Sequence, residues 1–312
     1  MDGSLTIVFA GTPRFAVPTL EALINNGVDV RLAVTQPDRP SGRGLTMSAS
    51  PVKESAVKHG IPVAQPDKIK ANEAFRAQLE GLHPDAIVVV GYGRLIPQWM
   101  IDLPRFGNLN LHASLLPKYR GAAPIQWAIA LGETVTGITT MLIDAGLDTG
   151  DILLQREIAI GPHDTAGSIA PKMAEIGGQL MVETLRGLQA GTVEPHPQDH
   201  SKATLAPILT KEDGKIDFGR SASEVWNRLR GFSPWPGAYT TFRGKTLRIW
   251  QARPTTIKLP SAEIRVESNV ASIGCRDSSL ELLEVQIEGK KRMSSQDFIN
   301  GYRPKSGERV DE

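Results

Sequence analysis

The stretch LTIVFAG, residues 5–11, is a continuous apolar run that ends at a glycine. A strand buried on both faces has this character, whereas a strand with one wet face alternates apolar and polar side chains. The next segment, residues 14–27, repeats apolar side chains at helical spacing and ends at Gly27, which predicts a helix. Residues 28–36 predict a second strand, and DAIVVVG, residues 85–91, predicts another strand buried on both faces.

The order of these elements predicts the fold class. Amphipathic segments favour further helices at residues 51–60 and 71–82. Strands that alternate with helices build a doubly wound, Rossmann-like and mostly parallel α/β sheet with right-handed crossovers. Further along the chain we predict a strand at 107–112, a helix at 123–133, a strand at 137–143, and a long helix at 165–190 that Gly177 and Gly178 interrupt.

The composition and periodicity of the sequence change after Gly191. The following stretch contains three prolines and little periodicity, so residues 191–209 are interpreted as a linker. Beyond it lie one helical segment, several short strand-like runs with turn signals, and a closing helix, which together predict a small barrel or sandwich. We therefore expect one domain over residues 1–190 and a second over residues 210–312.

Composition narrows the class of protein. The chain has 312 residues, 40% hydrophobic and 22% charged, which is typical of a soluble protein with two domains. No apolar run reaches the roughly 18 residues needed to span a bilayer. The first residues carry Asp2 where a signal peptide has basic side chains, so we interpret them as leading into the first strand. The sole cysteine, Cys275, excludes an internal disulfide, and a reducing cytoplasm fits best.

The net charge of +1 gives no global sign of nucleic-acid binding, but basic side chains are unevenly distributed. Residues 220–258 hold eight Arg or Lys and a single acid, Glu224, which gives a local charge of +7. Such a cluster is either a footprint for a polyanion or simply a solvated face. The sequence leaves both interpretations open.

Polar side chains lie at or just beyond the ends of two of the predicted strands. Asn110 and His112 are two residues apart, so they face the same side of an extended strand. Asp148 lies in DAGLDTGDIL, residues 144–153, just past the strand 137–143, from which we expect it to reach the same rim. An amide and an imidazole can stabilise an oxyanion or move protons, and a carboxylate can orient the imidazole. The alternatives are a structural histidine and an Asp-Gly turn.

A long segment, QPDRPSGRGLTMSAS at residues 36–50, has Pro, Gly and Ser throughout and no apolar period. Long loops inside compact domains are usually functional or disordered, and this one carries Arg39 and Arg43. Other signals are weak. The G-x-G-x-x-G and Walker A patterns are missing, and the prolines around His196 and His200 argue against a helical metal site, so no metal is expected.

Two distant segments together resemble the signature of formyltransferases that use 10-formyltetrahydrofolate. The first is N-x-H-x-S-L-L-P-x-x-R-G-A-x-P, from Asn110 to Pro124, and the second is L-D-T-G-D, from Leu147 to Asp151. The resemblance implies that Asn110 and His112 stabilise the oxyanion and that Asp148 holds His112 and assists proton transfer. It also implies that no metal is needed and that the folate pocket is lined by Ser114, Leu115, Leu116 and Pro117.

Three further features resemble the branch of this family that formylates initiator methionyl-tRNA. They are F-A-G-T-P-x-F-A-x-P from Phe9, the loop Q-P-D-R-P-x-G-R-G from Gln36, and F-x-P-W-P-G at Phe232–Gly237 followed by G-K-K-x-M-x-x-x-D-F. The resemblance implies an OB-fold-like second domain that helps to hold the tRNA, which would give the basic cluster a role. Family members often carry lysines where this loop has Leu45-Thr46, so Arg43, with Arg39, is expected to bind the tRNA.

The rival hypotheses are another formyltransferase or hydrolase on the same fold, and a non-catalytic RNA-binding protein. The tRNA-type loop argues against the first, and the intact set of Asn110, His112 and Asp148 argues against the second. We expect a cytoplasmic monomer that uses 10-formyltetrahydrofolate as co-substrate.

Overall fold

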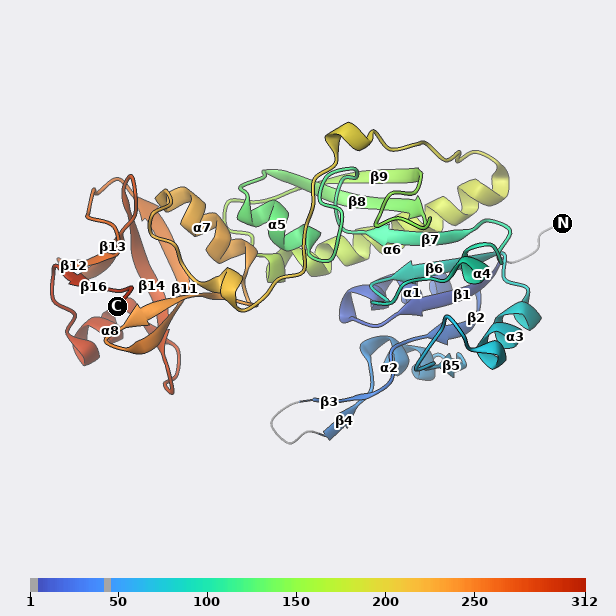
Figure 1. Cartoon of the computed structure of the whole chain (residues 1–312), viewed down its shortest axis with the longest axis horizontal. Helices are drawn as coiled ribbons and strands as arrows, with labels where there is room; N and C mark the ends of the chain where they lie inside the picture. Colours follow the sequence, from blue (N-terminus) through green and yellow to red (C-terminus); the bar gives the residue numbers. More distant parts are fainter. Residues whose placement is uncertain (1–4, 42–45) are drawn as a thin grey trace. The chain divides into compact units, whose positions relative to one another are not determined.

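A computed structural model describes residues 5–41 and 46–312 (Figure 1). The chain divides into two compact units that are interleaved along the sequence. The first comprises the described residues of Met1–Gly121 together with Thr136–Ala159 and Ala170–Leu205. The second comprises Ala122–Val135, Ile160–Ile169 and Ala206–Glu312.

The first unit is built on a seven-stranded sheet with the order β5-β2-β1-β6-β7-β8-β9. The strands from β5 to β7 are parallel to their neighbours, and β8 is antiparallel to β7. This mostly parallel sheet confirms the predicted fold class. The strands are β1 (Thr6–Gly11), β2 (Asp29–Val34), β5 (Val63–Ala64), β6 (Ala86–Val90), β7 (Asn108–His112), β8 (Val135–Leu142) and β9 (Ile152–Ala159).

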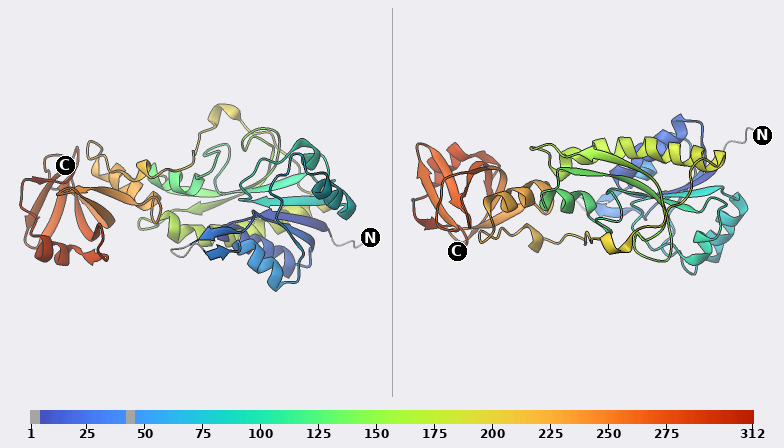
Figure 2. Two further views of the ribbon diagram at one scale, coloured as in Figure 1. Left: turned by 60° about the horizontal axis from the view of Figure 1, so that its bottom comes forward. Right: turned by 90° about the horizontal axis from the view of Figure 1, so that it is seen from above.

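Helices cover both faces of this sheet (Figure 2). Every residue of β6 is buried, as its uninterrupted apolar sequence predicts. One face packs against the Phe75 and Leu79 side chains of α3 and Met100 of α4. The helices are α1 (Val17–Asn25), α2 (Pro51–Lys58), α3 (Glu73–Leu82), α4 (Gln98–Ile101) and α6 (Ala166–Ala190), with short 3-10 turns at η1 (Arg14–Ala16) and η2 (His200–Lys202).

The long helix α6 is continuous through Gly177 and Gly178, so the expected interruption is wrong. Close packing explains these two glycines. A Cβ at Gly177 would lie 2.7 Å from the Leu111 side chain of β7, and a Cβ at Gly178 would lie 2.8 Å from the carbonyl oxygen of Pro18 in α1. The glycines therefore let α6 approach both the sheet and the neighbouring helix.

The segment interpreted as a long loop, residues 36–50, contains a short two-stranded ribbon. Strand β3 (Arg39–Ser41) pairs antiparallel with β4 (Thr46–Ser48). Because a strand pair needs only backbone hydrogen bonds, it forms here without an apolar period. Arg43 and Leu45 lie outside the described residues.

The second unit contains an antiparallel, barrel-like sheet with the order β10-β11-β14-β13-β12-β16, and β15 pairs with β14. This confirms the predicted small barrel. Phe242, Ile264, Leu280 and Phe298 are among its buried core. Its elements are α5 (Pro124–Ala130), η3 (Glu212–Gly214), α7 (Ala222–Gly231), β10 (Ala238–Phe242), β11 (Lys245–Thr255), β12 (Glu263–Glu267), β13 (Val270–Gly274), β14 (Ser279–Ile287), β15 (Met293–Ser294), α8 (Ser295–Tyr302) and β16 (Glu308–Arg309).

Helices α5 and α7 pack together within this unit. The Trp127 and Phe232 rings meet edge to face with their centroids 5.4 Å apart. A Cβ at Gly231 would lie 2.6 Å from the backbone of α5, so the two helices touch backbone to backbone at that point. Among the helices of the described residues, none is long and apolar enough to cross a membrane.

Candidate active site

The carboxyl ends of three adjacent strands define the candidate site. Chain order in the sheet reverses between β1 and β6, and ligands of open α/β sheets bind beyond the carboxyl edge at such a reversal. Gly11 at the end of β1 pairs with Val90 of β6, and Val89 pairs with Asn110 of β7. Asn110 and His112 therefore lie at this edge, as the sequence predicts.

Hydrogen bonds that were not predicted from the sequence connect the loops beyond this edge. The carbonyl oxygen of Tyr92, just after β6, accepts hydrogen bonds from the Thr12 hydroxyl at 3.3 Å and the Gln36 side chain at 3.1 Å. These residues follow β1 and β2, so one backbone carbonyl connects the segments that follow β1, β2 and β6. Isolated polar residues after strands carry no pattern that would reveal such a contact.

The His112 ring is held in one orientation. Its side chain is 6% exposed, and its Nε2 lies 2.9 Å from the carbonyl oxygen of Tyr119. A carbonyl can only accept a hydrogen bond, so Nε2 carries a proton and donates it. The other ring nitrogen, Nδ1, lies 3.6 Å from Oδ2 of Asp148. At this distance the two groups form an ion pair only when the ring is protonated on both nitrogens, and they are too far apart for a hydrogen bond.

Asn110 differs from His112 in its surroundings. It is half-buried, and its side chain forms no hydrogen bond to any residue that the structure describes. A free amide at the edge of the sheet can donate to a ligand without first breaking an internal contact. The strand thus presents one uncommitted amide and one anchored imidazole on the same side.

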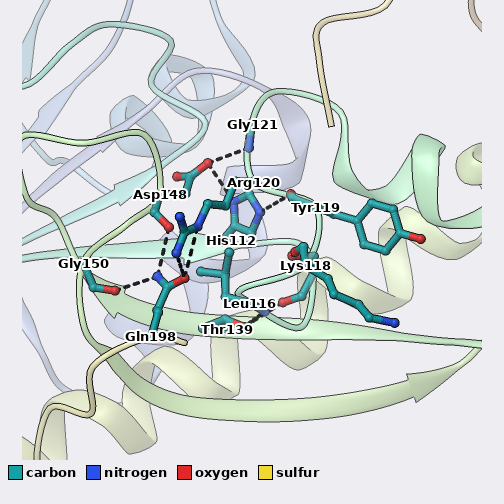
Figure 3. Close-up of polar contacts among 11 residues, drawn as sticks. His112, Leu116, Lys118, Tyr119, Arg120, Gly121, Thr139, Asp148, Gly150 and Gln198 are labelled. Atoms are coloured by element: carbon teal, nitrogen blue, oxygen red, sulfur yellow. Dashed lines mark hydrogen bonds and ion pairs between the residues drawn. The ribbon is translucent and has the colours of Figure 1, made fainter. Parts of the chain in front are cut away.

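Asp148 reaches His112 by a different route from the one expected. Because β8 is antiparallel to β7, Leu142 at the end of β8 pairs with Leu109 near the start of β7. The loop after β8 must therefore run back toward His112. Asp148 adopts a left-handed φ of 51° in this loop, and its Oδ2 accepts a hydrogen bond of 2.8 Å from the Gly121 amide (Figure 3). The predicted proximity of Asp148 and His112 is confirmed. The expected reason for it, that the strands before them end at the same edge of the sheet, is wrong because β8 is antiparallel to β7.

The four residues expected to line the folate pocket form a turn that is fixed from neighbouring strands. The Ser114 hydroxyl is fully buried and donates to the carbonyl oxygen of Lys118 at 2.6 Å. The Thr139 hydroxyl of β8 donates to the Ser114 carbonyl at 2.7 Å and accepts from the Leu116 amide at 3.2 Å. Leu116 is buried, whereas Leu115 and Pro117 are partly exposed.

A second set of polar contacts surrounds Asp148 and comes from the segment interpreted as a linker. The Gln198 side-chain amide donates to the carbonyl oxygens of Asp148 and Gly150, and its oxygen accepts from the Arg120 guanidinium (Figure 3). Arg120 belongs to the motif from Asn110 to Pro124, so the sequence indicated that it lies near the site. No sequence pattern indicated Gln198, because a glutamine after a proline looks like any other polar linker residue.

The base of the ribbon β3–β4 is fixed, and Arg39 projects from it as an exposed residue. The Lys53 ammonium lies 2.6 Å from one oxygen of Asp38, and the Gln65 amide donates to the other at 2.8 Å. These two hydrogen bonds hold the pKa of Asp38 below its usual range. Arg43 cannot be placed relative to Arg39, since it lies outside the described residues.

No group of three or more His, Cys, Asp or Glu side chains within residues 5–41 and 46–312 could hold a metal ion. The polar groups at the site are an amide, an imidazole and one carboxylate, a set that can stabilise charge on a carbonyl oxygen and move protons.

Comparison with known proteins defines the class. The model of the family described as "Formyl transferase" matches residues 5–185, and that described as "Formyl transferase, C-terminal domain" matches residues 208–303. The chain therefore belongs to the formyl transferase family. Relatives that match over nearly its whole length include methionyl-tRNA formyltransferases. That of Koribacter versatilis is 62% identical, with 98% of each chain covered, and that of Acidobacterium capsulatum is 60% identical, with 95% of this chain and 96% of the relative covered.

A solved structure gives the same fold at low sequence identity. The N-formyltransferase from Helicobacter canadensis, in complex with folinic acid and dTDP-3-aminofucose, matches with a TM-score of 0.66 at 18% identity, with 90% of this chain and 99% of that chain covered. At this identity the likeness concerns the fold alone.

Proposed function

We propose that the protein transfers the formyl group of 10-formyltetrahydrofolate to the α-amino group of initiator methionyl-tRNA. The observation that carries this proposal is the 62% identity to a methionyl-tRNA formyltransferase over 98% of both chains. The geometry supports it independently, because Asn110, His112 and Asp148 meet at the carboxyl edge where this fold binds ligands. The product, N-formylmethionyl-tRNA, serves the initiation of translation.

The reaction joins the amine to the formyl carbon and releases tetrahydrofolate. A free α-amine has a pKa near 8, so at neutral pH it must lose a proton before it attacks. Attack on the formyl carbon gives a tetrahedral oxyanion with a positive charge on the attacking nitrogen. Collapse of this intermediate breaks the bond to N10 of the folate, which takes up a proton. Overall one proton moves from the amine to N10.

Each side chain has a role that follows from its contacts. The uncommitted amide of Asn110 donates to the oxyanion. Because Nε2 of His112 already donates to Tyr119, the ring acts through Nδ1, which takes up a proton and can then donate to the same oxyanion. The carboxylate of Asp148, 3.6 Å from Nδ1, stabilises the resulting imidazolium. No covalent intermediate is required.

Substrate binding divides between the two parts of the chain in this proposal. Residues 1–190 bind the folate and perform the chemistry, with the turn of Ser114, Leu115, Leu116 and Pro117 at the folate. Leu115 and Pro117 offer side chains to it, since they are partly exposed, whereas Ser114 and Leu116 contribute through the backbone they fix. Residues 210–312 hold the tRNA, and the basic cluster at 220–258 supports this through contacts to phosphate. We also propose that the protein is a cytoplasmic monomer, because the site is built from one chain.

The test is transfer of a labelled formyl group from 10-formyltetrahydrofolate. Methionyl-tRNA should become labelled, while uncharged tRNA and a nucleotide-linked amino sugar should not. The amino sugar distinguishes this proposal from sugar N-formylation on the same fold. Labelling of the sugar in preference to methionyl-tRNA would overturn the assigned substrate, and release of free formate alone would indicate a hydrolase.

The ribbon arginines provide a separate prediction about tRNA. Arg39 projects from a ribbon whose base is fixed by Asp38 and Lys53, so its guanidinium, with that of Arg43, is proposed to bind phosphates of the acceptor end. We expect Arg39→Ala and Arg43→Ala each to raise KM for methionyl-tRNA several-fold and to leave KM for the folate within about two-fold. Steady-state kinetics at fixed ionic strength measures both constants. Unchanged KM for the tRNA in both variants would show that the ribbon is an inert connection.

A further inference from the structure

Three consecutive residues position both titratable side chains of the site. The carbonyl oxygen of Tyr119 accepts a hydrogen bond from Nε2 of His112, and the amide of Gly121 donates to the carboxylate of Asp148 (Figure 3). Between them stands Arg120, which is 7% exposed and points into the same cluster. Anything that fixes the backbone of Arg120 therefore fixes His112 and Asp148 together.

The segment of residues 198–205 holds this backbone in place. The Arg120 amide donates to the carbonyl oxygen of Thr204 at 2.8 Å, and the Tyr119 amide donates to the Thr204 hydroxyl at 2.9 Å. Arg120 also forms an isolated parallel bridge with Leu205. The part of the chain interpreted from sequence as a linker thus forms hydrogen bonds with the backbone of Tyr119 and Arg120.

The Gln198 side chain uses its full hydrogen-bonding capacity. Its amide nitrogen donates to the carbonyl oxygens of Asp148 at 2.9 Å and Gly150 at 2.7 Å. Its oxygen accepts from Nε of Arg120 at 3.2 Å and from Nη2 at 2.6 Å. A glutamine amide has two donor hydrogens and two acceptor lone pairs, so all four are used here. With only 6% of the residue exposed, little water competes for them.

The acceptors of Arg120 are neutral. Besides Gln198, its guanidinium donates to Nδ1 of His200 at 3.0 Å. A buried guanidinium has to be hydrogen-bonded to be tolerated, and these contacts supply that. One interpretation is therefore that Gln198 exists only to satisfy Arg120. That interpretation does not explain the two hydrogen bonds that the Gln198 amide nitrogen donates to the backbone on both sides of Thr149.

We propose that Gln198, anchored by Arg120, is a positioning residue that holds the Asp148 loop so that the carboxylate faces His112. The inference rests on the proposed formyl transfer. Asp148 occupies a left-handed conformation that residues other than glycine seldom adopt, so the loop needs outside support to keep it. Gln198 supplies that support at the Asp148 carbonyl itself. Residues 198–205 are in this way part of the active site rather than a spacer.

The substitution Gln198→Glu separates the two interpretations. Glutamate has the same shape and pairs with Arg120 at least as well, but it places an oxygen against the carbonyls of Asp148 and Gly150. If Gln198 only satisfies Arg120, kcat stays at the wild-type value. If it positions Asp148, kcat falls about 10- to 100-fold while KM for folate and for methionyl-tRNA changes less than about three-fold. The matched control is Gln78→Glu, at an exposed glutamine of α3, which should leave kcat unchanged.

A double variant tests whether Gln198 acts through Asp148. In single-turnover experiments, adding Gln198→Glu to Asp148→Asn should lower the rate by no more than about two-fold, because the carboxylate it positions is already gone. Losses that multiply instead would overturn the proposal. If Gln198→Glu fails to fold, Arg120→Lys replaces it. A single ammonium cannot hold the amide oxygen through two bonds, so kcat should still fall about ten-fold, and an unchanged kcat would overturn the proposal.

Hydrogen exchange keeps this test independent of the substrate assignment. Without any substrate, the amide of Gly121, protected by Asp148 in the wild type, should exchange faster in Gln198→Glu. Faster exchange in a protein that transfers no formyl to methionyl-tRNA would contradict the proposed function alone. Unchanged exchange together with unchanged kcat would contradict the positioning role alone.

Discussion

A single backbone contact sets the chemistry available to His112. The carbonyl of Tyr119 can only accept a hydrogen bond, so the ring keeps its Nε2 proton, and in the proposed mechanism it acts through Nδ1. The types of side chain at the site could be predicted from the sequence, because Asn110, His112 and the Asp148 motif stand at the ends of strands. Which ring nitrogen of His112 faces the substrate could not be predicted, because that depends on where the Tyr119 carbonyl lies relative to the ring.

Cys275 provides a prediction about pH at this scale. The residue is 2% exposed, and burial raises the pKa of its thiol from an ordinary value of 9.0 to about 12. The unfolded chain releases this proton near pH 9, while the folded chain holds it to higher pH. The stability that this thiol contributes is therefore fully present below pH 9 and is lost as the pH rises toward 12.

The prediction is that Cys275 resists thiol reagents in the folded protein. At pH 8 its alkylation should be slow and limited by opening of the protein, and it should become much faster once denaturant unfolds the chain. Because the protein has a single cysteine, one measurement of labelling by mass spectrometry follows this residue alone. Rapid labelling under native conditions would contradict the buried, neutral thiol.

Elements show where sequence patterns determine structure and where they do not. Buried strands such as β1 and β6 were predictable, because an apolar run bounded by glycine is a local property. The direction of β8 could not be predicted, because the direction of pairing depends on which strand it lies beside. Strand β9 was missed, because three consecutive positions in it are polar or charged and its sequence does not alternate. The glycines of α6 looked like breaks and instead mark close packing.

The loop between β8 and β9 provides the prediction at this scale. A Cβ at Gly150 would lie 2.0 Å from the carbonyl oxygen of Leu142, and the backbone would have to move to admit it. We expect Gly150→Ala to shift Asp148 and lower kcat about 10- to 100-fold. The matched control is Gly81→Ala in α3, where nothing lies within 4 Å, and which should raise the free energy of unfolding by about 0.4–1 kcal/mol. Equal kcat in the two variants would argue against a sterically required glycine at 150.

The whole molecule is organised by units that the linear sequence conceals. The second unit takes α5 and residues 160–169 from the middle of the chain. Within it, α5 packs on α7 through Trp127 and Phe232. A composition change after Gly191 was visible in the sequence, but this exchange of segments was not, because it depends on contacts between residues about 100 positions apart.

This interleaving predicts the behaviour of a truncated protein. A fragment ending at Ala206 retains Trp127 but lacks Phe232 and α7, so the apolar face of α5 loses its partner within its own unit. Removing an aromatic side chain from such a contact typically costs about 3–5 kcal/mol, which lowers Tm by roughly 10 °C for a fragment of this size. Calorimetry compares it with a fragment ending at Gly237, which keeps α7 and should melt higher. Equal melting temperatures would show that α5 does not depend on α7.

The central claim is that Asn110 and His112 stabilise the oxyanion of formyl transfer with Asp148 behind them. The most direct test is the single-turnover rate of formyl transfer from 10-formyltetrahydrofolate to methionyl-tRNA, with both substrates saturating. Removing one oxyanion donor typically costs about 2.7–4 kcal/mol, so Asn110→Ala and His112→Ala should each slow transfer roughly 100- to 1,000-fold, with Asp148→Asn on a similar scale. Melting temperatures near that of the wild type would establish that these losses are chemical. Transfer at close to the wild-type rate in Asn110→Ala and His112→Ala would contradict the claim.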